Sequence, residues 1–285
     1  MPLDASVVGY PFATLEVVCD ARWLMAYAAG VPDVRPELYD TTTALVTHPI
    51  FSVAPEWELL IAPRATSTSM SRTEMARGVH TAHDVIVRRS LVAGESIVIT
   101  ATVIGADRRR SGATQQVLFE AIDANGELVW RTKMTSLFRG VELLGDPTYV
   151  ACDWPNSPGR ESSMDTTIAQ RTNWVRPADA HVYSECARIW NPIHTDVAFA
   201  RSAGLDDPIF HGTATLARAV SIATELAGVE LADVARVAGR FAAMVDLGSS
   251  INVRVLDIVG PVVHFDVLNH RGERAIRDGF LVVRT

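Results

Sequence analysis

The sequence predicts an α+β protein made of two similar units, each with an antiparallel sheet and a helix packed against it. Apolar residues recur at helical spacing from Thr213 to Ala227, and four strand-like runs follow them. An earlier set of strand-like runs lies between Asp84 and Arg139. Because the chain has 285 residues, 48% of them hydrophobic, it is long enough to bury the core of two such units.

The first half opens with a helix and then becomes irregular. Asp20 is placed to cap a helix that Gly30 closes, and Pro32 prevents its continuation. Prolines interrupt residues 31–78, so no long helix is predicted there. We therefore expect a full central helix only in the C-terminal unit.

An antiparallel meander follows in the first half. The predicted strands are residues 97–104, 115–120 and 128–132, and Asn125-Gly126 is typical of a tight hairpin between the last two. His80 and His83 are interpreted as histidines that flank a strand entrance. A stretch rich in glycine, proline and polar residues then indicates a boundary. We predict an N-terminal unit at 1–145, a linker at 146–163 and a C-terminal unit at 164–285.

The second half repeats the plan with a longer helix. A short strand at 168–174 precedes a helix that Asp179 is expected to cap and that Pro192 is expected to stop. The strands after the central helix are predicted at residues 234–244, 250–256, 262–268 and 275–283, with a turn at 269–272.

The stretch IWNPIHTDVAFARSAGLDDPIFHGTAT, residues 189–215, contains the candidate reaction centre. Proline at 192 holds His194 on a rigid turn, where a neutral imidazole can offer a lone pair to water. Gly212 allows close backbone approach at the start of the apolar helix. Free amides at that helix start would face a developing oxyanion.

This stretch resembles the signature of the MaoC-like, (R)-specific enoyl-CoA hydratase family, also called hydratase 2. The resemblance lies in WNPIHTDVAFARSAG followed by IFHGTATLA. Members of the family have the hot-dog fold, in which an antiparallel sheet wraps a long helix. The resemblance implies a tandem, or double, hot-dog whose C-terminal unit carries the catalytic residues and whose N-terminal unit shapes the acyl pocket.

The resemblance also implies a hydratase or dehydratase that adds or removes water across the 2,3-double bond of an acyl thioester. His194 corresponds to the acid/base, the Gly212 amide to the oxyanion donor, His211 to a residue that orients the loop, and Asn191 to one that positions water or thioester. The family motif Gly-Asp-x-Asn-Pro-(Leu/Ile)-His has isoleucine here in place of its catalytic aspartate, at Ile189.

Two acids are candidates for the missing carboxylate. Glu185 lies four residues before Ile189, and Asp196 lies two residues after His194. The alternatives are a solvated helix residue at Glu185 and a helix cap at Asp196. Further candidates for substrate contact are Ile189, Trp190, Asp196, Arg108 and Arg109. The two arginines belong to a basic cluster that either binds coenzyme A phosphates or forms a solvated hairpin tip.

Composition narrows the class of partner. A net charge of −7 argues against a nucleic-acid surface, and no apolar run reaches the roughly 20 residues that span a bilayer. The three scattered cysteines suggest neither disulfides nor zinc. We expect a cytoplasmic protein without metal or cofactor that takes an acyl-CoA or acyl-carrier-protein thioester. Two such double units could pair further as a homodimer.

Other classes remain open at this stage. A metal site at His194 and Asp196 lacks a third ligand at suitable spacing, and no Gly-x-Ser-x-Gly elbow supports a serine hydrolase. The main competitor is a binding protein that holds acyl thioesters or stabilises a partner, its activity lost with the aspartate. Retention of Asn191, His194, His211 and Gly212 favours the enzyme.

Overall fold

The computed structural model describes residues 2–61, 70–75, 77–160 and 166–284. The N-terminal half contains β1 (Leu3–Asp4), β2 (Pro11–Cys19), α1 (Ala21–Gly30), α2 (Val53–Ile61), α3 (Arg72–Met75), β3 (Gly78–Val87), β4 (Glu95–Arg109), β5 (Gly112–Asp123), β6 (Leu128–Arg139), β7 (Leu143–Leu144) and β8 (Thr148–Tyr149). The C-terminal half contains β9 (Ala169–Val175), α4 (Asp179–Ala187), α5 (Val197–Ser202), α6 (Gly212–Ala227), β10 (Val234–Phe241), β11 (Ser249–Val259), β12 (Val262–Asn269) and β13 (Arg274–Val283). Short 3₁₀ turns are η1 (Ala5–Val7), η2 (Pro36–Leu38), η4 (Pro192–His194) and η5 (Leu231–Asp233).

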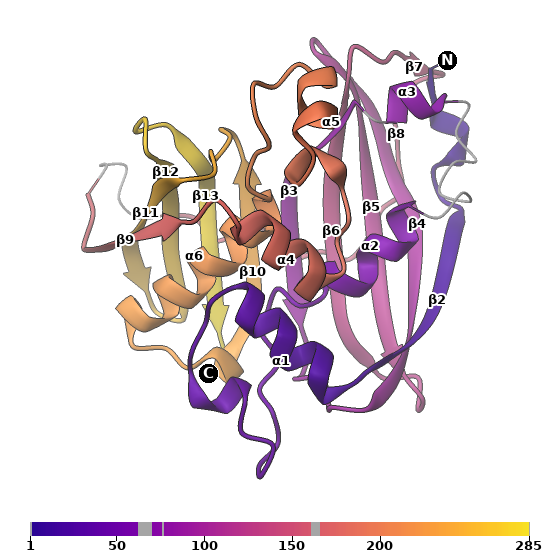
Figure 1. The fold of residues 1–285 in the computed structure, drawn as a ribbon. Coiled ribbons are helices and arrows are strands. Elements are labelled where there is room, and N and C mark those ends of the chain that lie inside the picture. Colours follow the sequence, from indigo (N-terminus) through magenta and orange to yellow (C-terminus); the bar gives the residue numbers. More distant parts are fainter. Residues whose placement is uncertain (1, 62–69, 76, 161–165, 285) are drawn as a thin grey trace.

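The sheet shows that the two halves share one topology. Its order is β2-β4-β5-β6-β3-β10-β13-β12-β11-β9, with β8 beside β4. Strands β9 to β13 therefore occupy the places that β2 to β6 occupy in the first half. The equivalent strands β3 and β10 pair antiparallel at the centre and join the halves into one sheet (Figure 1). One chain thus forms by itself the continuous sheet that two separate units would form by pairing.

The helices lie against this sheet. Helix α6 contacts β11, β12 and β13, and α2 contacts β2 (Figure 1). Residues 214–224 of α6 are buried without a break, as expected of a helix enclosed by its sheet. Helix α6 has 16 residues and α2 has nine, so for the described residues the long helix belongs only to the C-terminal half, as predicted. No described helix is long and apolar enough to cross a membrane.

Most predicted elements of the chain are present. The predicted strand runs of both halves correspond to β4, β5, β6 and β9 to β13, although the run at 168–174 begins one residue before β9 and the run at 234–244 ends three residues beyond β10. The Asn125-Gly126 hairpin joins β5 to β6 with Gly126 at φ 80°. Asp20 caps α1 by accepting a hydrogen bond from the Trp23 amide at 2.7 Å. The division into units at 145 and 164 stays a prediction, and β8 pairs with β4 inside the segment expected to be a linker.

Three local predictions were wrong. Helix α4 ends at Ala187, before Pro192, because Arg188 adopts the left-handed conformation at φ 57°. Asp179 is the first residue of α4 and provides no side-chain cap for its free amides; it accepts hydrogen bonds from the Arg176 amide and from Arg218. His80 and His83 lie within β3 and do not flank its entrance.

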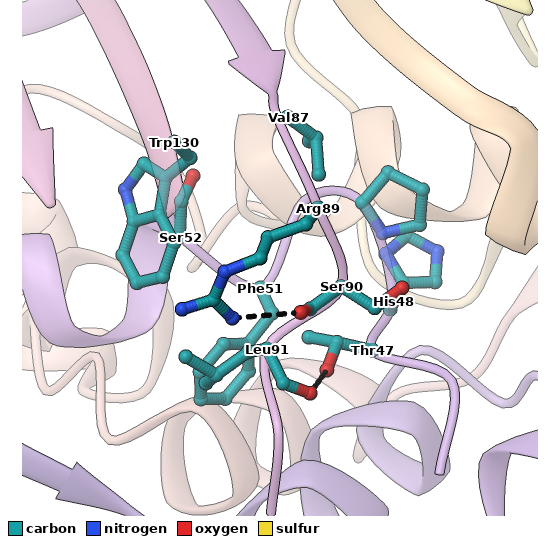
Figure 2. A pocket seen from close by; sticks show the side chains of 10 residues that line it. Thr47, His48, Phe51, Ser52, Val87, Arg89, Ser90, Leu91 and Trp130 are labelled. Atoms are coloured by element: carbon teal, nitrogen blue, oxygen red, sulfur yellow. Dashed lines mark hydrogen bonds between the residues drawn. The ribbon is translucent and has the colours of Figure 1, made fainter. Parts of the chain in front are cut away.

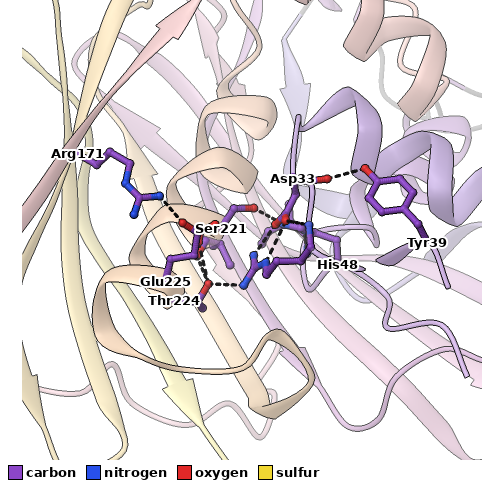
Figure 3. A network of polar contacts seen from close by, with 10 residues as sticks. Asp33, Tyr39, His48, Arg171, Ser221, Thr224 and Glu225 are labelled. Carbon is purple, nitrogen blue, oxygen red and sulfur yellow. Dashed lines mark hydrogen bonds and ion pairs between the residues drawn. The ribbon is translucent and has the colours of Figure 1, made fainter. Parts of the chain in front are cut away.

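A polar stripe on α6 fixes the helix to the N-terminal half (Figure 3). The Ile50 amide donates to His48 Nδ1 at 3.1 Å, so His48 Nε2 carries the proton and donates to Ser221 Oγ at 3.1 Å. Arg35 donates to Thr224 Oγ1 at 3.1 Å and to the Asp33 carboxylate. Burial alone would raise the pKa of Asp33, but hydrogen bonds from Arg35 and Ser221 lower it. The hydroxyls of Ser221 and Thr224 on α6 therefore bind groups of the N-terminal half.

Helices α1 and α4 hold the segment before His194. A side chain at Gly30 would come within 2.8 Å of Cys186 Cβ, so the two helices are in close contact. The Tyr27 and Tyr183 hydroxyls lie 3.4 Å apart, and the Arg188 guanidinium lies 4.0 Å from the Trp23 ring centroid. Such a cation–π contact contributes about 0.5–1 kcal/mol. It offsets part of the strain of Arg188.

Candidate active site

His194 is oriented by a hydrogen bond to the backbone. It ends the η4 turn, whose start is capped weakly by the Asn191 side chain through the Ile193 amide at 3.4 Å. His194 Nδ1 lies 2.8 Å from the Ile209 carbonyl oxygen, which can only accept, so Nδ1 carries the proton. Nε2 then bears the lone pair and has no partner among the described residues. This is the tautomer that a general base requires.

A second imidazole lies against the first. The His194 and His211 rings are stacked with centroids 3.7 Å apart and an interplanar angle of 27°. His211 Nε2 is 3.1 Å from Ser184 Oγ. Burial lowers the pKa of His194 to about 4, and burial together with His194 lowers the pKa of His211 well below its usual value. Both rings are therefore neutral at pH 7. Protonation of one ring would disfavour protonation of the other, because the two positive charges would lie side by side.

Gly212 places a free amide next to the two histidines. It is the first residue of α6, and His211, at the N-cap position, gives the helix no side-chain cap. The first amides of a helix have no intrahelical acceptor and carry the positive end of its dipole. A side chain at 212 would come within 3.0 Å of Phe241 Cδ1. Any larger residue at 212 would therefore press on the Phe241 ring, and the helix start offers donors to an anionic oxygen.

A buried ion pair positions the loop before Gly212. Arg218 donates to Asp179 at 2.7 Å, and both side chains are 2% exposed. The same guanidinium lies 4.6 Å from the Phe210 ring centroid, and the Phe210 amide donates to the Val245 carbonyl at 2.8 Å. The loop that holds the acceptor for His194 is thus tied to α6, α4 and the segment after β10.

The other motif residues have mainly structural surroundings. Ile189 is 5% exposed and packs in the main hydrophobic core. Asp196 caps α5 through the Phe199 amide at 3.0 Å, and Trp190 is exposed. Glu185 is exposed on α4. Because α4 ends at Ala187, the helix face expected to join Glu185 to Ile189 does not form.

Arg108 and Arg109 lie at the end of β4, at the hairpin to β5. Arg108 donates to the Gly145 carbonyl, and Arg109 pairs with Asp107 at 3.1 Å. Both side chains are more than half exposed, which agrees with the alternative of a solvated tip. Their contact with a phosphate stays a prediction.

A small pocket opens in the N-terminal half (Figure 2). It is lined by Thr47, His48, Pro49, Phe51, Ser52, Val87, Arg89, Ser90, Leu91 and Trp130. Arg89 is held there by Glu95 and Asp123, and the Trp130 indole donates to buried Glu56 at 2.9 Å. Of the pocket residues, His48 also belongs to the network on α6. The pocket contains neither His194 nor Gly212.

A known family model matches the stretch of the chain that contains this site. Residues 156–266 match the family model described as MaoC like domain. The C-terminal half is therefore similar to a MaoC-like domain over this stretch. The match includes β9, the His194 turn, Gly212 and the whole of α6. The signature recognised in the sequence is thereby confirmed at the level of the domain.

Known structures extend the likeness to nearly the whole chain. A MaoC-like dehydratase from Phytophthora capsici superimposes with a TM-score of 0.83 at 20% identity, covering 98% of both chains. A Mycobacterium tuberculosis protein described as having a double hotdog fold gives 0.59 at 12% identity, covering 96% of this chain and 95% of that one. The fold is therefore a double hot-dog, as predicted.

A further relative is longer than this chain. The peroxisomal multifunctional enzyme type 2 of Drosophila melanogaster is 24% identical over 219 residues, which cover 75% of this chain and 36% of the relative. Its full-length structure matches with a TM-score of 0.76 at 20% identity, covering 95% of this chain and 48% of that one. The chain thus spans less than half the length of this relative.

The candidate site also contains groups that the sequence did not predict. The Ile209 carbonyl is a backbone acceptor, so no side chain marks it in the sequence. Ser184 reaches His211 from a different helix, 27 residues away. Thr215 Oγ1 donates to the His211 carbonyl at 3.0 Å. Of these contacts, this is the one that a local pattern could have predicted, because the two residues are four positions apart at the start of a helix.

The buried histidines predict loss of stability on mild acidification. Burial lowers the pKa of His80 to about 3, and of His48, His83 and His194 to about 4. The unfolded chain therefore binds more protons below about pH 6.5. The stability that these neutral rings contribute is present above about pH 6.5 and is lost toward pH 4.

Each such histidine should lower the free energy of unfolding by about 1.4 kcal/mol per pH unit inside that window. Glu56 has the opposite effect on stability, because burial raises its pKa to about 8 and the folded chain therefore binds one more proton at this position than the unfolded chain. Urea unfolding at pH 7 and pH 5.5 measures the difference. A free energy of unfolding that does not change between these values contradicts the neutral, buried state of the histidines.

Proposed function

We propose that the chain is a hydratase or dehydratase acting on the 2,3-bond of an acyl thioester of the enoyl-CoA or 3-hydroxyacyl-CoA type. The observation that carries the proposal is the pairing of a correctly oriented base with an unpaired helix amide: His194 with Nδ1 bound to Ile209, and Gly212 at the start of α6. The match of residues 156–266 to the MaoC like domain and the likeness to the MaoC-like dehydratase of Phytophthora capsici support the same class.

In the hydration direction, His194 Nε2 takes a proton from water as its oxygen bonds to the β-carbon. The electron pair of the double bond moves onto the thioester oxygen, which accepts a hydrogen bond from the Gly212 amide. The protonated His194 then returns the proton to the α-carbon, which completes the addition of water. General acid–base catalysis of this kind contributes about 10²–10⁴-fold, and one oxyanion donor about 10²–10³-fold.

The absence of a motif carboxylate sets the character of this base. The Ile209 carbonyl fixes the ring but does not carry a full negative charge, and buried Ile189 occupies the motif position. The pKa of His194, about 4, makes the ring a weaker base than a histidine near 6.5. We therefore propose slow turnover, with His194 working without a carboxylate partner.

Restoring the acid tests that account. Ile189→Asp should raise the rate of hydration about 10-fold or more, because a carboxylate beside the imidazoles favours the protonated base. The same change should lower stability by about 1–3 kcal/mol, since the position is buried. Ile189→Asn is the matched control, with similar shape and no charge. Equal rates for both variants would show that charge at 189 does not limit the reaction.

The second candidate is an acyl-thioester-binding protein without catalysis. The burial of Ile189 in the core favours it, because the motif position then contributes packing and no chemistry. The two candidates differ in one outcome: the binding protein retains enoyl-CoA and 3-hydroxyacyl-CoA without converting them. Assays across acyl chain length, with coenzyme A and carrier-protein thioesters in parallel, measure that outcome and identify the carrier.

A further inference from the structure

His83 lies at the junction of the two units with its side chain on the inner face of the sheet. It belongs to β3 and pairs with Gly239 of β10, two residues before buried Val85. Cross-strand partners project to the same face. At Gly239, an added side chain would come within 3.3 Å of Leu216 Cδ1. Inner-face side chains at this level therefore project toward the first turns of α6.

Neighbouring rings extend this position to the oxyanion donor. The His80 and His83 ring centroids are 5.4 Å apart, and the His80 and Phe241 centroids are 4.8 Å apart. Phe241 is the residue that a side chain at Gly212 would meet at 3.0 Å. A continuous row of rings thus leads from His83 to the amide at the start of α6.

Both ring nitrogens of His83 are buried and have no hydrogen-bond partner among the residues that the structure describes, and the residue is 1% exposed. In contrast, His80 Nε2 lies 3.0 Å from the Ala82 carbonyl, and His48 uses both of its nitrogens. A neutral imidazole has one donor and one acceptor, and each buried group left unpaired costs about 1–3 kcal/mol. Packing alone would favour an apolar residue at this position.

We propose that His83 is a substrate-binding residue, contributed by the N-terminal unit, whose imidazole hydrogen-bonds the thioester head of the acyl substrate beside Gly212. This inference rests on the proposed function for the class of substrate. It assigns the unpaired nitrogens a partner that is present only when substrate is bound. It also explains why one β-strand of each unit is needed to complete the site.

The test compares two variants at His83 with one variant at a matched control position. His83→Leu removes the polar atoms, and His83→Gln retains a donor and an acceptor. His264→Leu is the control. His264, on β12, is also buried and its Nε2 has no hydrogen-bond partner among the described residues, but its ring lies against Phe280 of β13. The readouts are kcat/KM for enoyl-CoA hydration, the dissociation constant of a saturated acyl-CoA, and the thermal midpoint without ligand.

We expect His83→Leu to melt at the same or a higher temperature than wild type, while kcat/KM falls at least 10-fold and binding of the saturated acyl-CoA weakens. His83→Gln should recover part of kcat/KM and part of the binding of the saturated acyl-CoA, and His264→Leu should leave kcat/KM and this binding unchanged. Unchanged binding in His83→Leu, or loss of its fold, overturns the proposal. If wild type binds acyl-CoA but does not hydrate enoyl-CoA, the proposed function fails, and the binding comparison alone then decides the role of His83.

Discussion

His194→Ala should reduce hydration of an enoyl-CoA by about 10²-fold or more while the protein remains folded. The reason is that Nε2 of this ring carries the oriented lone pair of the site, whereas among the described residues the ring would lose one hydrogen bond, from Nδ1 to the Ile209 carbonyl. The effect should fall on kcat, because the proton transfer occurs in the transition state. Steady-state kinetics with wild type and variant at pH 7 measure it.

Glu185→Gln is the control for that experiment, because Glu185 is exposed on α4 and α4 ends before Ile189. We expect its rate to equal that of wild type. A loss as large as that of His194→Ala would show that Glu185 supplies the missing carboxylate. A small effect of His194→Ala would instead remove this histidine from the mechanism.

Arg218→Met should lower the free energy of unfolding by about 3–5 kcal/mol, the largest effect on stability that we expect from one substitution. It removes the buried guanidinium that donates to Asp179 at 2.7 Å and leaves that carboxylate paired with the exposed Arg176, whose Nε also donates at 2.7 Å. It also removes the guanidinium from the Phe210 ring, so the loop with the Ile209 carbonyl loses a contact. Urea unfolding measures the first effect, and kcat measures the second.

A double-mutant cycle separates the loss of the Arg218–Asp179 ion pair from the loss of packing between Arg218 and Phe210. Arg218→Met combined with Asp179→Leu replaces the buried pair with apolar groups, and it should recover most of the stability lost in Arg218→Met. If the double variant is as unstable as the sum of the single ones, the two residues do not act as a pair. Recovery of stability without recovery of kcat would locate the functional role in the contact with Phe210.

Local sequence patterns were sufficient for much of the fold. The helical spacing of apolar residues predicted α6 from Thr213 to Ala227, one residue from its observed start. Asn125-Gly126 predicted the β5–β6 hairpin, and Asp20 predicted the N-terminal cap of α1, because both features depend on a few adjacent residues. The motif around His194 and Gly212 is likewise contiguous, so the two central groups of the candidate site were found.

Features that join distant parts of the chain were not predicted. His83 meets the C-terminal unit through the pairing of β3 with β10, more than 150 residues apart, and Asp179 meets Arg218 from 39 residues away. The helix face that would join Glu185 to Ile189 does not form because Arg188 ends α4 in a left-handed conformation that a non-glycine residue rarely adopts. These contacts depend on tertiary packing, which the spacing of residues within one segment does not encode.

Product formation from enoyl-CoA substrates of graded chain length, by wild type and His194→Ala side by side, tests the central claim most directly. We predict that wild type converts at least one of them to the 3-hydroxyacyl-CoA and that His194→Ala converts it about 10²-fold more slowly while binding it with similar affinity. Binding of these thioesters by wild type with no conversion, together with conversion by Ile189→Asp, would contradict the enzyme assignment and identify a binding protein.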